Sequence, residues 1–323
     1  MGALRVGVLA YPGCFASEVF GVPDLLTMAM HVAGPDRAGY EVSVVSPRRR
    51  VAAAGGMPLA VSPLRTVDVL VVPGFEFPPG LDVDAKLASL APDIAAIRAH
   101  AAAGDGVVSL CVGAFLLAEA GLLSRRRATT SWLHADELAR RCPDTDVRAD
   151  RLVVTDKGVT TTAAFSAMYD FALELIRRHS GAGVARTTAR VALVDAARTS
   201  QTPYVDPRLL PQPGNEFSQR VMRRLDQSLT ARYDLAALSD AFNVSTRTLL
   251  RRFADETGRS PLAYLQSSRV RRARHLLETT DRTVASIAAA VGYRDPGTFA
   301  ALFARHTGRR PGDYRATFRR GDG

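Results

Sequence analysis

Two arginines four residues apart, Arg247 and Arg251, have the type and spacing to contact DNA bases. On a helix, residues at positions i and i+4 share a face, so both guanidinium groups project in one direction. A guanidinium can donate two hydrogen bonds to the O6 and N7 atoms of guanine in the major groove. This spacing therefore predicts base contacts, provided that the segment is an exposed helix.

Neighbouring side chains extend this candidate interface. Arg252 lies about 100° further round such a helix and is better placed for a phosphate contact. Ser245 is expected to cap the start of the helix through its hydroxyl group. The other candidates for DNA contact are Thr246, Thr248, Arg294 and Thr298.

A cysteine at a sharp turn suggests a second kind of chemistry. Val107–Gly113 is typical of a strand that ends at Cys111 and is followed by a helix, the geometry of a nucleophile elbow. A thiol at a helix N-terminus is expected to have a lowered pKa, because the helix dipole favours the thiolate. Glu18 follows the first strand and is expected at the same carboxyl edge of the sheet, where α/β folds bind ligands. The candidate ligand-binding residues are Glu18, Gly74, Cys111 and Val112.

The elements before residue 180 alternate between short apolar runs and helical stretches. Runs such as Val69–Val72 are apolar on both faces, as buried parallel strands are. This alternation predicts an α/β fold with an open parallel sheet covered by helices. We expect strands at 4–10, 41–46, 68–72 and 107–110, and helices at about 16–31, 85–102, 113–122, 166–179 and 184–197.

The rest of the chain has no strand signals. Residues 199–217 contain four prolines and Gly214, which are too many helix breakers for a helix, so we expect a linker. The sequence thus predicts a first domain at 1–198, a linker at 199–217 and an all-α domain at 218–323. Its expected helices are 217–230, 235–242, 246–256, 261–279, 284–290, 296–306 and 311–318.

The all-α part repeats itself with a period of 50 residues. Residues 245–264 align with 295–314 at eight identical positions, which indicates a duplicated helical unit. Each copy has a short support helix, a turn and a second helix, the parts of a helix-turn-helix. The helix at 261–279 would join the two copies over about 28 Å, close to the distance between successive turns of a major groove. Its arginines are expected to help position the domain on DNA.

The net charge of +10 lies entirely in the second half. Residues 1–217 carry 22 basic and 22 acidic side chains, whereas residues 218–323 carry 20 and 10. This segregation favours a polyanionic partner for the all-α part alone. An apolar content of 47% excludes wholesale disorder.

The cysteines and the hydropathy bear on the compartment. Three cysteines are too few, and odd in number, for a disulfide framework. The apolar run at 4–10 lacks the basic flank of a signal peptide, and no apolar run reaches 18 residues. We therefore expect a cytoplasmic protein without a membrane span, and the sequence indicates neither a metal nor a cofactor.

Residues 218–318 resemble the AraC/XylS family of transcription regulators. The matching residues are Gly292-Tyr293, Phe299, Phe303, Gly308, Pro311 and Tyr314-Arg315. The resemblance implies binding of double-stranded DNA, with RNA polymerase as a further partner. The family commonly has an arginine within the second reading helix, whereas this sequence has Phe299-Ala-Ala-Leu-Phe303. This departure implies weak base contacts by the second unit.

Residues 4–180 resemble the ThiJ/PfpI type of the class I glutamine-amidotransferase-like superfamily. The matching segments are Val69–Gly74, Cys111–Leu123 and Ala128–Trp132. Together with an AraC-type domain, this looks like the GlxA-type regulators. The resemblance implies a flavodoxin-like sheet domain that forms a homodimer and senses a small-molecule effector.

The sequence argues against catalysis by Cys111, because a thiol nucleophile needs a nearby base. Val112 and Ser131 stand where relatives of the superfamily have histidines, and 156–170 contains none. His100 and His134 remain, but a lone histidine is more often structural. Cys111 is then either a ligand-lining residue or a small buried residue at a turn. Glu18 is either a ligand contact or a carboxylate that satisfies backbone amides at a helix N-terminus.

We therefore expect a dimeric, sequence-specific transcription regulator that is not an enzyme. Three alternatives remain: a thiol-dependent amidase or hydratase tethered to DNA, an architectural protein blind to sequence, and a helical module for protein–protein contacts.

Overall fold

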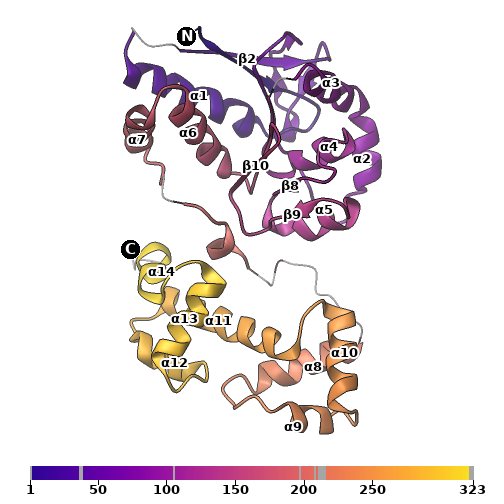
Figure 1. The fold of residues 1–323 in the computed structure, drawn as a ribbon, viewed down its shortest axis with the longest axis vertical. Helices are drawn as coiled ribbons and strands as arrows, with labels where there is room; N and C mark the ends of the chain where they lie inside the picture. The colour runs from indigo at the N-terminus through magenta and orange to yellow at the C-terminus, as the bar shows by residue number, and fades with distance from the viewer. Residues whose placement is uncertain are drawn as a thin grey trace. The chain divides into compact units, whose positions relative to one another are not determined.

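The computed structural model divides the chain into two compact units, Met1–Gln201 and Thr202–Gly323 (Figure 1). It describes residues 2–35, 39–104, 106–195, 198–206, 209 and 216–319. Each unit has its own hydrophobic core, so each is treated by itself.

The N-terminal unit is built on a sheet of seven strands within the described residues. Neighbouring strands run parallel except for one antiparallel edge strand, β10. The order across the sheet is β10 (Val153–Asp156), β11 (Val159–Thr162), β7 (Gly106–Ser109), β6 (Val69–Val72), β1 (Leu4–Leu9), β2 (Tyr40–Ser46) and β5 (Ser62–Pro63).

Helices cover both faces of this sheet (Figure 1). One group is α1 (Ala16–Ala33), α6 (Ala167–His179) and α7 (Ala182–Val191), which contact one another. The other is α2 (Val83–Ser89), α3 (Ala91–Ala102) and α4 (Ala114–Glu119). This arrangement confirms the predicted flavodoxin-like α/β fold. Outside these layers lie α5 (Ala135–Arg141) and the small strand pairs β3 (Val51–Ala52) with β4 (Pro58–Leu59) and β8 (Arg127–Ala128) with β9 (Asp146–Val147).

Several predicted bounds in this unit are wrong. The single helix expected at 85–102 is two helices, because α3 starts afresh with Pro92 in its first turn. The hairpin of β10 and β11 was not predicted. Its strands are only four residues long, and its turn uses Lys157 and Gly158 at positive φ instead of the usual Asn-Gly signal. The helix expected at 184–197 ends at Val191, and residues 196–197 lie outside the described part of the chain.

The C-terminal unit is helical throughout the described residues 216–319, as predicted. Phe253 belongs to a first core and Phe303 to a second, and helix α11 contributes residues to both. The helices are α8 (Glu216–Gln227), α9 (Leu235–Asp240), α10 (Thr246–Thr257), α11 (Pro261–Thr279), α12 (Val284–Ala290), α13 (Pro296–Thr307) and α14 (Pro311–Phe318).

The segment that leads from one unit to the next is held at both of its described ends. In the first unit, the Gln201 side chain accepts a hydrogen bond from the N–H of Trp132 and donates one to the carbonyl of Thr130. In the second unit, the Arg274 guanidinium donates to the carbonyls of Pro203 and Val205. Residues 207–208 and 210–215 of the predicted linker lie outside the described part.

No helix among the described residues has the length and apolar character needed to cross a bilayer.

Candidate nucleic-acid interface and buried thiol site

Helix α10 presents Arg247 and Arg251 because its other face is buried. The Ser245 Oγ accepts a hydrogen bond of 3.1 Å from the Thr248 N–H and so caps the helix. Leu249 and Phe253 are fully buried in the first core. Both arginines are exposed, and the structure shows no ion pair or hydrogen bond of their side chains among the described residues. The two guanidinium groups are therefore available to a partner.

Other predicted contacts on α10 already have intramolecular roles. The Thr248 hydroxyl lies 2.9 Å from that of Ser245, so both take part in the cap. The Arg252 Nε donates to Glu256 over 2.8 Å, and its guanidinium lies 4.2 Å from the centre of the Phe217 ring. Thr246 is exposed at the first turn. Arg252 thus helps to fix α8 against α10, although half of its side chain is exposed.

Helix α13 repeats this construction with a poorer exposed face. Asp295 caps it by accepting hydrogen bonds from the Thr298 N–H and hydroxyl, at 2.7 and 2.6 Å. The exposed positions that match the two arginines of α10 are Gly297 and Ala301. Arg294 is exposed immediately before the cap. Thr298 is thus committed to the cap, whereas Arg294, which precedes the helix, has no ion pair with another described residue.

The two turns before the reading helices each contain one residue at positive φ. Asn243 has φ 52° and Gly292 has φ 86°. The next residue in each turn, Val244 or Tyr293, donates its N–H back into the preceding helix. Asn is among the few residues besides Gly that tolerate this conformation. Asn243 and Gly292 are 49 positions apart, whereas equivalent residues of the two reading helices are 50 apart. An alignment with a strict period of 50 residues therefore does not pair Asn243 with Gly292.

Three of the four arginines of α11 that are expected to help position the domain on DNA have partners within the described chain. Arg269 is buried, and it donates to the carbonyls of Leu229 and Ala231 while stacking over Tyr293. Arg274 binds the Tyr314 hydroxyl besides the two carbonyls described above. Of the four arginines, only Arg272 is exposed, whereas the others are buried or partly buried. The sequence could not separate these roles, because all four guanidinium groups lie within six residues of one another.

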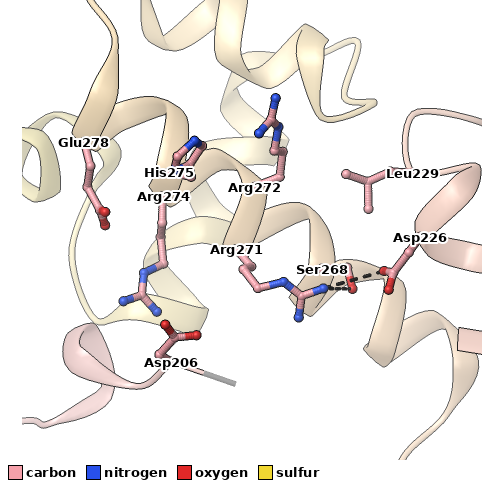
Figure 2. Close-up of a pocket in the computed structure, with 9 residues that line it drawn as sticks. All are labelled: Asp206, Asp226, Leu229, Ser268, Arg271, Arg272, Arg274, His275 and Glu278. Carbon is pink, nitrogen blue, oxygen red and sulfur yellow. Dashed lines mark hydrogen bonds and ion pairs between the residues drawn. The ribbon is translucent and has the colours of Figure 1, made fainter. Parts of the chain in front are cut away.

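A cleft of about 510 Å³ lies along α11, and the positive charges of its arginines are offset by nearby carboxylates (Figure 2). Figure 2 shows Arg271 directed at Ser268 and Asp226, with distances of 2.8 Å to the serine Oγ and 3.6 Å to the carboxylate. Its acidic residues are Asp206, Asp226 and Glu278, which offset Arg271, Arg272 and Arg274. The cleft therefore offers no net attraction to a phosphate backbone.

The thiol site has the predicted elbow. Cys111 has φ 50° at the end of β7 and begins a short 3₁₀ turn, Cys111–Gly113, that leads into α4. A Cβ atom at Gly113 would lie 2.5 Å from the Pro73 carbonyl oxygen, so only glycine fits there. Val112 is buried in the core of the unit.

Glu18 and Gly74 lie beside this cysteine. Glu18 is fully buried, and its Oε2 accepts a hydrogen bond of 2.5 Å from the Gly74 N–H. Its Oε1 has no hydrogen-bond partner within the described chain. A Cβ atom at Gly74 would lie 3.1 Å from the Cys111 Cβ and 3.2 Å from the Glu18 Oε2. The structure thus brings together three of the four predicted ligand-site residues. It also shows that Glu18 binds a loop amide of another element instead of the start of its own helix.

The pKa expected for the thiol is wrong. Burial raises the pKa of Cys111 to about 12, and the nearby Glu18 charge adds to this rise. The backbone N–H groups of Val112 and Phe165 lower it, but their effect is smaller than that of desolvation. Burial also raises the pKa of Glu18 to about 7.

The two candidate bases have other partners. The His100 Nε2 lies 3.3 Å from the Gly106 carbonyl oxygen. The His134 ring lies 4.2 Å from the centre of Phe77, and burial lowers its pKa. Neither interaction involves the thiol. Among the described residues Cys111 therefore has a raised pKa and no histidine partner, and the ionisable group beside it is the carboxyl group of Glu18.

Comparison with known proteins confirms the predicted combination of domains. Residues 8–178 match the DJ-1/PfpI family, and residues 238–317 match a helix-turn-helix domain. The first match covers more than half of the chain, so the chain belongs to the DJ-1/PfpI family.

Three relatives illustrate the similarity. The chain is 28% identical over 221 residues to the HTH-type transcriptional regulator GlxA of Rhizobium meliloti, covering 66% of this chain and 65% of that one. It is 36% identical over 154 residues to an uncharacterized protein in the cpoL 5' region of Streptomyces lividans, covering 44% and 97%. It is 35% identical over 106 residues to the HTH-type transcriptional activator RhaR of Yersinia pseudotuberculosis, covering 33% and 37%. The chain thus spans less than two thirds of the two named regulators.

Proposed function

We propose that this protein is a sequence-specific DNA-binding transcription regulator that reads bases chiefly through α10. The observation that carries the proposal is the pair Arg247 and Arg251, exposed side by side on a helix whose opposite face is buried. The surrounding part of the chain has the entire net charge of +10. GlxA and RhaR, to which the chain is similar, are named as transcriptional regulators, which supports the same conclusion.

The duplicated unit suits a duplex that is contacted at two places. Helix α11 has 19 residues and is therefore about 28 Å long, which is close to one turn of B-form DNA. We propose that Arg247 and Arg251 contact base edges, with Thr246, Arg252 and Arg294 at the backbone. Ser245, Thr248 and Thr298 act by holding the helix starts. The small residues of α13 favour contact with thymine methyl groups over hydrogen bonding.

The N-terminal unit is proposed to form the homodimer and to sense a small effector. This assignment keeps the predicted parts, 1–198 as the sensor, 199–217 as the connecting segment and 218–323 as the DNA-binding part. We place the protein in the cytoplasm, and RNA polymerase is its proposed further partner. We propose no enzymatic activity, because the pKa of Cys111 is raised and no histidine contacts it among the described residues.

The test replaces Arg251 in the full chain, after a preferred duplex has been selected from random sequences. Arg251→Ala is expected to weaken binding to that duplex by about 1–3 kcal/mol, because a bidentate contact with guanine is lost. Arg251→Lys is the matched control, since it keeps the charge but not the bidentate geometry. We expect Arg251→Lys to weaken binding to the selected duplex and to bind random duplexes as tightly as the parent protein does. An equal loss on both kinds of duplex would contradict base reading.

A further inference from the structure

A cavity of about 620 Å³ lies in the N-terminal unit, away from the Cys111 site. It is lined by parts of β10, α6 and α7, by the two residues before β10, and by Arg198 and Thr199. All of its lining residues belong to the first compact unit.

The walls of this cavity combine apolar and cationic groups. Leu152, Leu173 and Ala185 are buried and form an apolar floor. Five of the fourteen lining residues are arginines, whereas only Asp170 and Glu174 are acidic. The lining residues therefore have three positive charges in excess, one of which, that of Arg151, pairs over 3.5 Å with Asp150 outside the lining; the overall charge of this chain half is zero. Such a local excess over an apolar floor attracts an anion that has an apolar body.

The existing ion pairs leave part of this charge unused. Glu174 accepts hydrogen bonds from Arg177 and Arg178, at 2.7 Å each. Arg186 has no ion pair or hydrogen bond with another described residue and lies on α7 at the rim. Two cationic side chains thus share one carboxylate and a third has none. The carboxylate of a bound ligand would therefore meet guanidinium groups that already line the cavity.

Arg198 provides a buried element of the same site. Its guanidinium pairs with Asp170 over 2.5 Å, and both side chains are largely buried. The Arg198 Nε is buried and has no hydrogen-bond partner among the described atoms. A buried N–H group without a partner is costly, so a ligand oxygen there would be favoured. Burial raises the pKa of Asp170 to about 6, although the paired Arg198 acts in the opposite direction.

We propose that this cavity is a binding site for a small amphipathic anion, a carboxylate on an aromatic or aliphatic body. Arg186 and Arg198 bind the carboxylate, and Leu152, Leu173 and Ala185 contact the body. The site lies entirely within the first unit, and Arg198 and Thr199 are its lining residues nearest to the end of that unit at Gln201. Binding of this anion does not depend on DNA recognition.

The experiment is calorimetric titration of the full chain with 1-naphthoate, in dilute buffer near pH 7.5. We expect one site per chain with a Kd on the order of 1 mM or below, as suits a ligand of this size. The neutral 1-naphthamide should bind at least about five-fold more weakly, because it cannot pair with guanidinium groups. Inorganic phosphate, which lacks an apolar body, should not displace 1-naphthoate at equal concentration.

Matched variants locate the site. Arg186→Met should weaken 1-naphthoate binding by about three- to ten-fold, since one charge-assisted contact is lost at a partly solvated rim. Arg190→Met is its control, because this exposed arginine lies one turn away on α7 and does not line the cavity. Ala182→Trp should reduce binding further by filling the space from an exposed position. Circular dichroism melting of each variant verifies folding.

Three results would overturn the proposal. They are the absence of 1-naphthoate binding to the folded chain, equal affinity for the acid and its amide, and an Arg186→Met variant that binds like Arg190→Met. Equal binding of phosphate and 1-naphthoate would rule out the apolar floor as part of the site.

Discussion

At the scale of single residues, Glu18 is the clearest case of a side chain that burial has changed. Its carboxyl group is closed off from water, and one oxygen is bonded to the Gly74 N–H. The second oxygen has no partner in the described structure. The charged form therefore loses hydration without full compensation, which raises its pKa from the ordinary 4.5 to about 7.

This shift predicts that Glu18→Gln stabilises the N-terminal unit at alkaline pH. The folded state binds the proton more tightly than the unfolded state, so protonation favours folding. That contribution is complete below about pH 4.5 and is lost as the pH rises through about 7. Glutamine keeps an acceptor for Gly74 and does not ionise. We expect little difference from the parent at pH 5 and a gain of about 2–3 kcal/mol at pH 8.

Urea unfolding followed by tryptophan fluorescence measures this effect in the correct unit, because Trp132 is the single tryptophan of the chain. Glu41→Gln, at an exposed position on β2, controls for the loss of one negative charge. A stability difference between Glu18→Gln and the parent that stays constant from pH 5 to 8 would argue against a buried titrating carboxyl group.

At the scale of elements, the two helix-turn-helix copies use identical residues for identical contacts. The Thr257 hydroxyl donates to the carbonyls of Phe253 and Arg259, and the Thr307 hydroxyl donates to those of Phe303 and Arg309. Gly258 and Gly308 end the helices in the left-handed conformation. The duplication therefore preserves how each reading helix is ended, whereas the exposed faces of α10 and α13 have diverged.

The turn before α13 leads to a prediction for Gly292→Ala. A methyl group there would lie 2.8 Å from the Thr230 carbonyl oxygen, and the backbone has φ 86°. Backbone strain and steric conflict together should destabilise the C-terminal unit by about 2–4 kcal/mol. Gly312→Ala is the control, because nothing lies within 4 Å of its Cβ and α14 is an ordinary helix. Hydrogen exchange of 235–307 should rise in the first variant alone. Unchanged protection there would refute the packing described for this turn.

At the scale of the whole molecule, charge and proposed role are divided between the two halves of the chain. The neutral half holds the Cys111 site and the amphipathic cavity, while the basic half holds the reading helices. The two helix-turn-helix copies of one chain can contact only a limited length of duplex. Dimerisation through the neutral half would bring two such units to one DNA without adding positive charge to the sensor.

The dimer proposal predicts that two half-sites act together. A duplex with two suitably spaced half-sites should bind the full chain about 10²- to 10⁴-fold more tightly than a duplex with one, because the second contact becomes intramolecular. Fluorescence anisotropy at fixed salt measures both affinities, since salt alone changes binding to phosphates. Sedimentation of the free protein provides the control for its oligomeric state. Equal affinity for both duplexes would mean that each chain binds alone.

Local sequence alone was enough to determine much of this protein. The α/β and all-α halves, the duplication, the elbow at Cys111 and the exposure of Arg247 and Arg251 all follow from periodicity, helix caps and glycine positions. These features depend on residues within one or two turns of each other, and such interactions leave a pattern in the sequence.

Contacts between distant segments decided the rest. Arg269 and Arg274 look like DNA-binding residues in the sequence, yet they bind carbonyl groups about 40 or more residues away. Cys111 lies at a helix start, but its pKa is raised because neighbouring elements exclude water and Glu18 lies close by. Desolvation and long-range pairing depend on which elements meet in space, and only the tertiary structure specifies that.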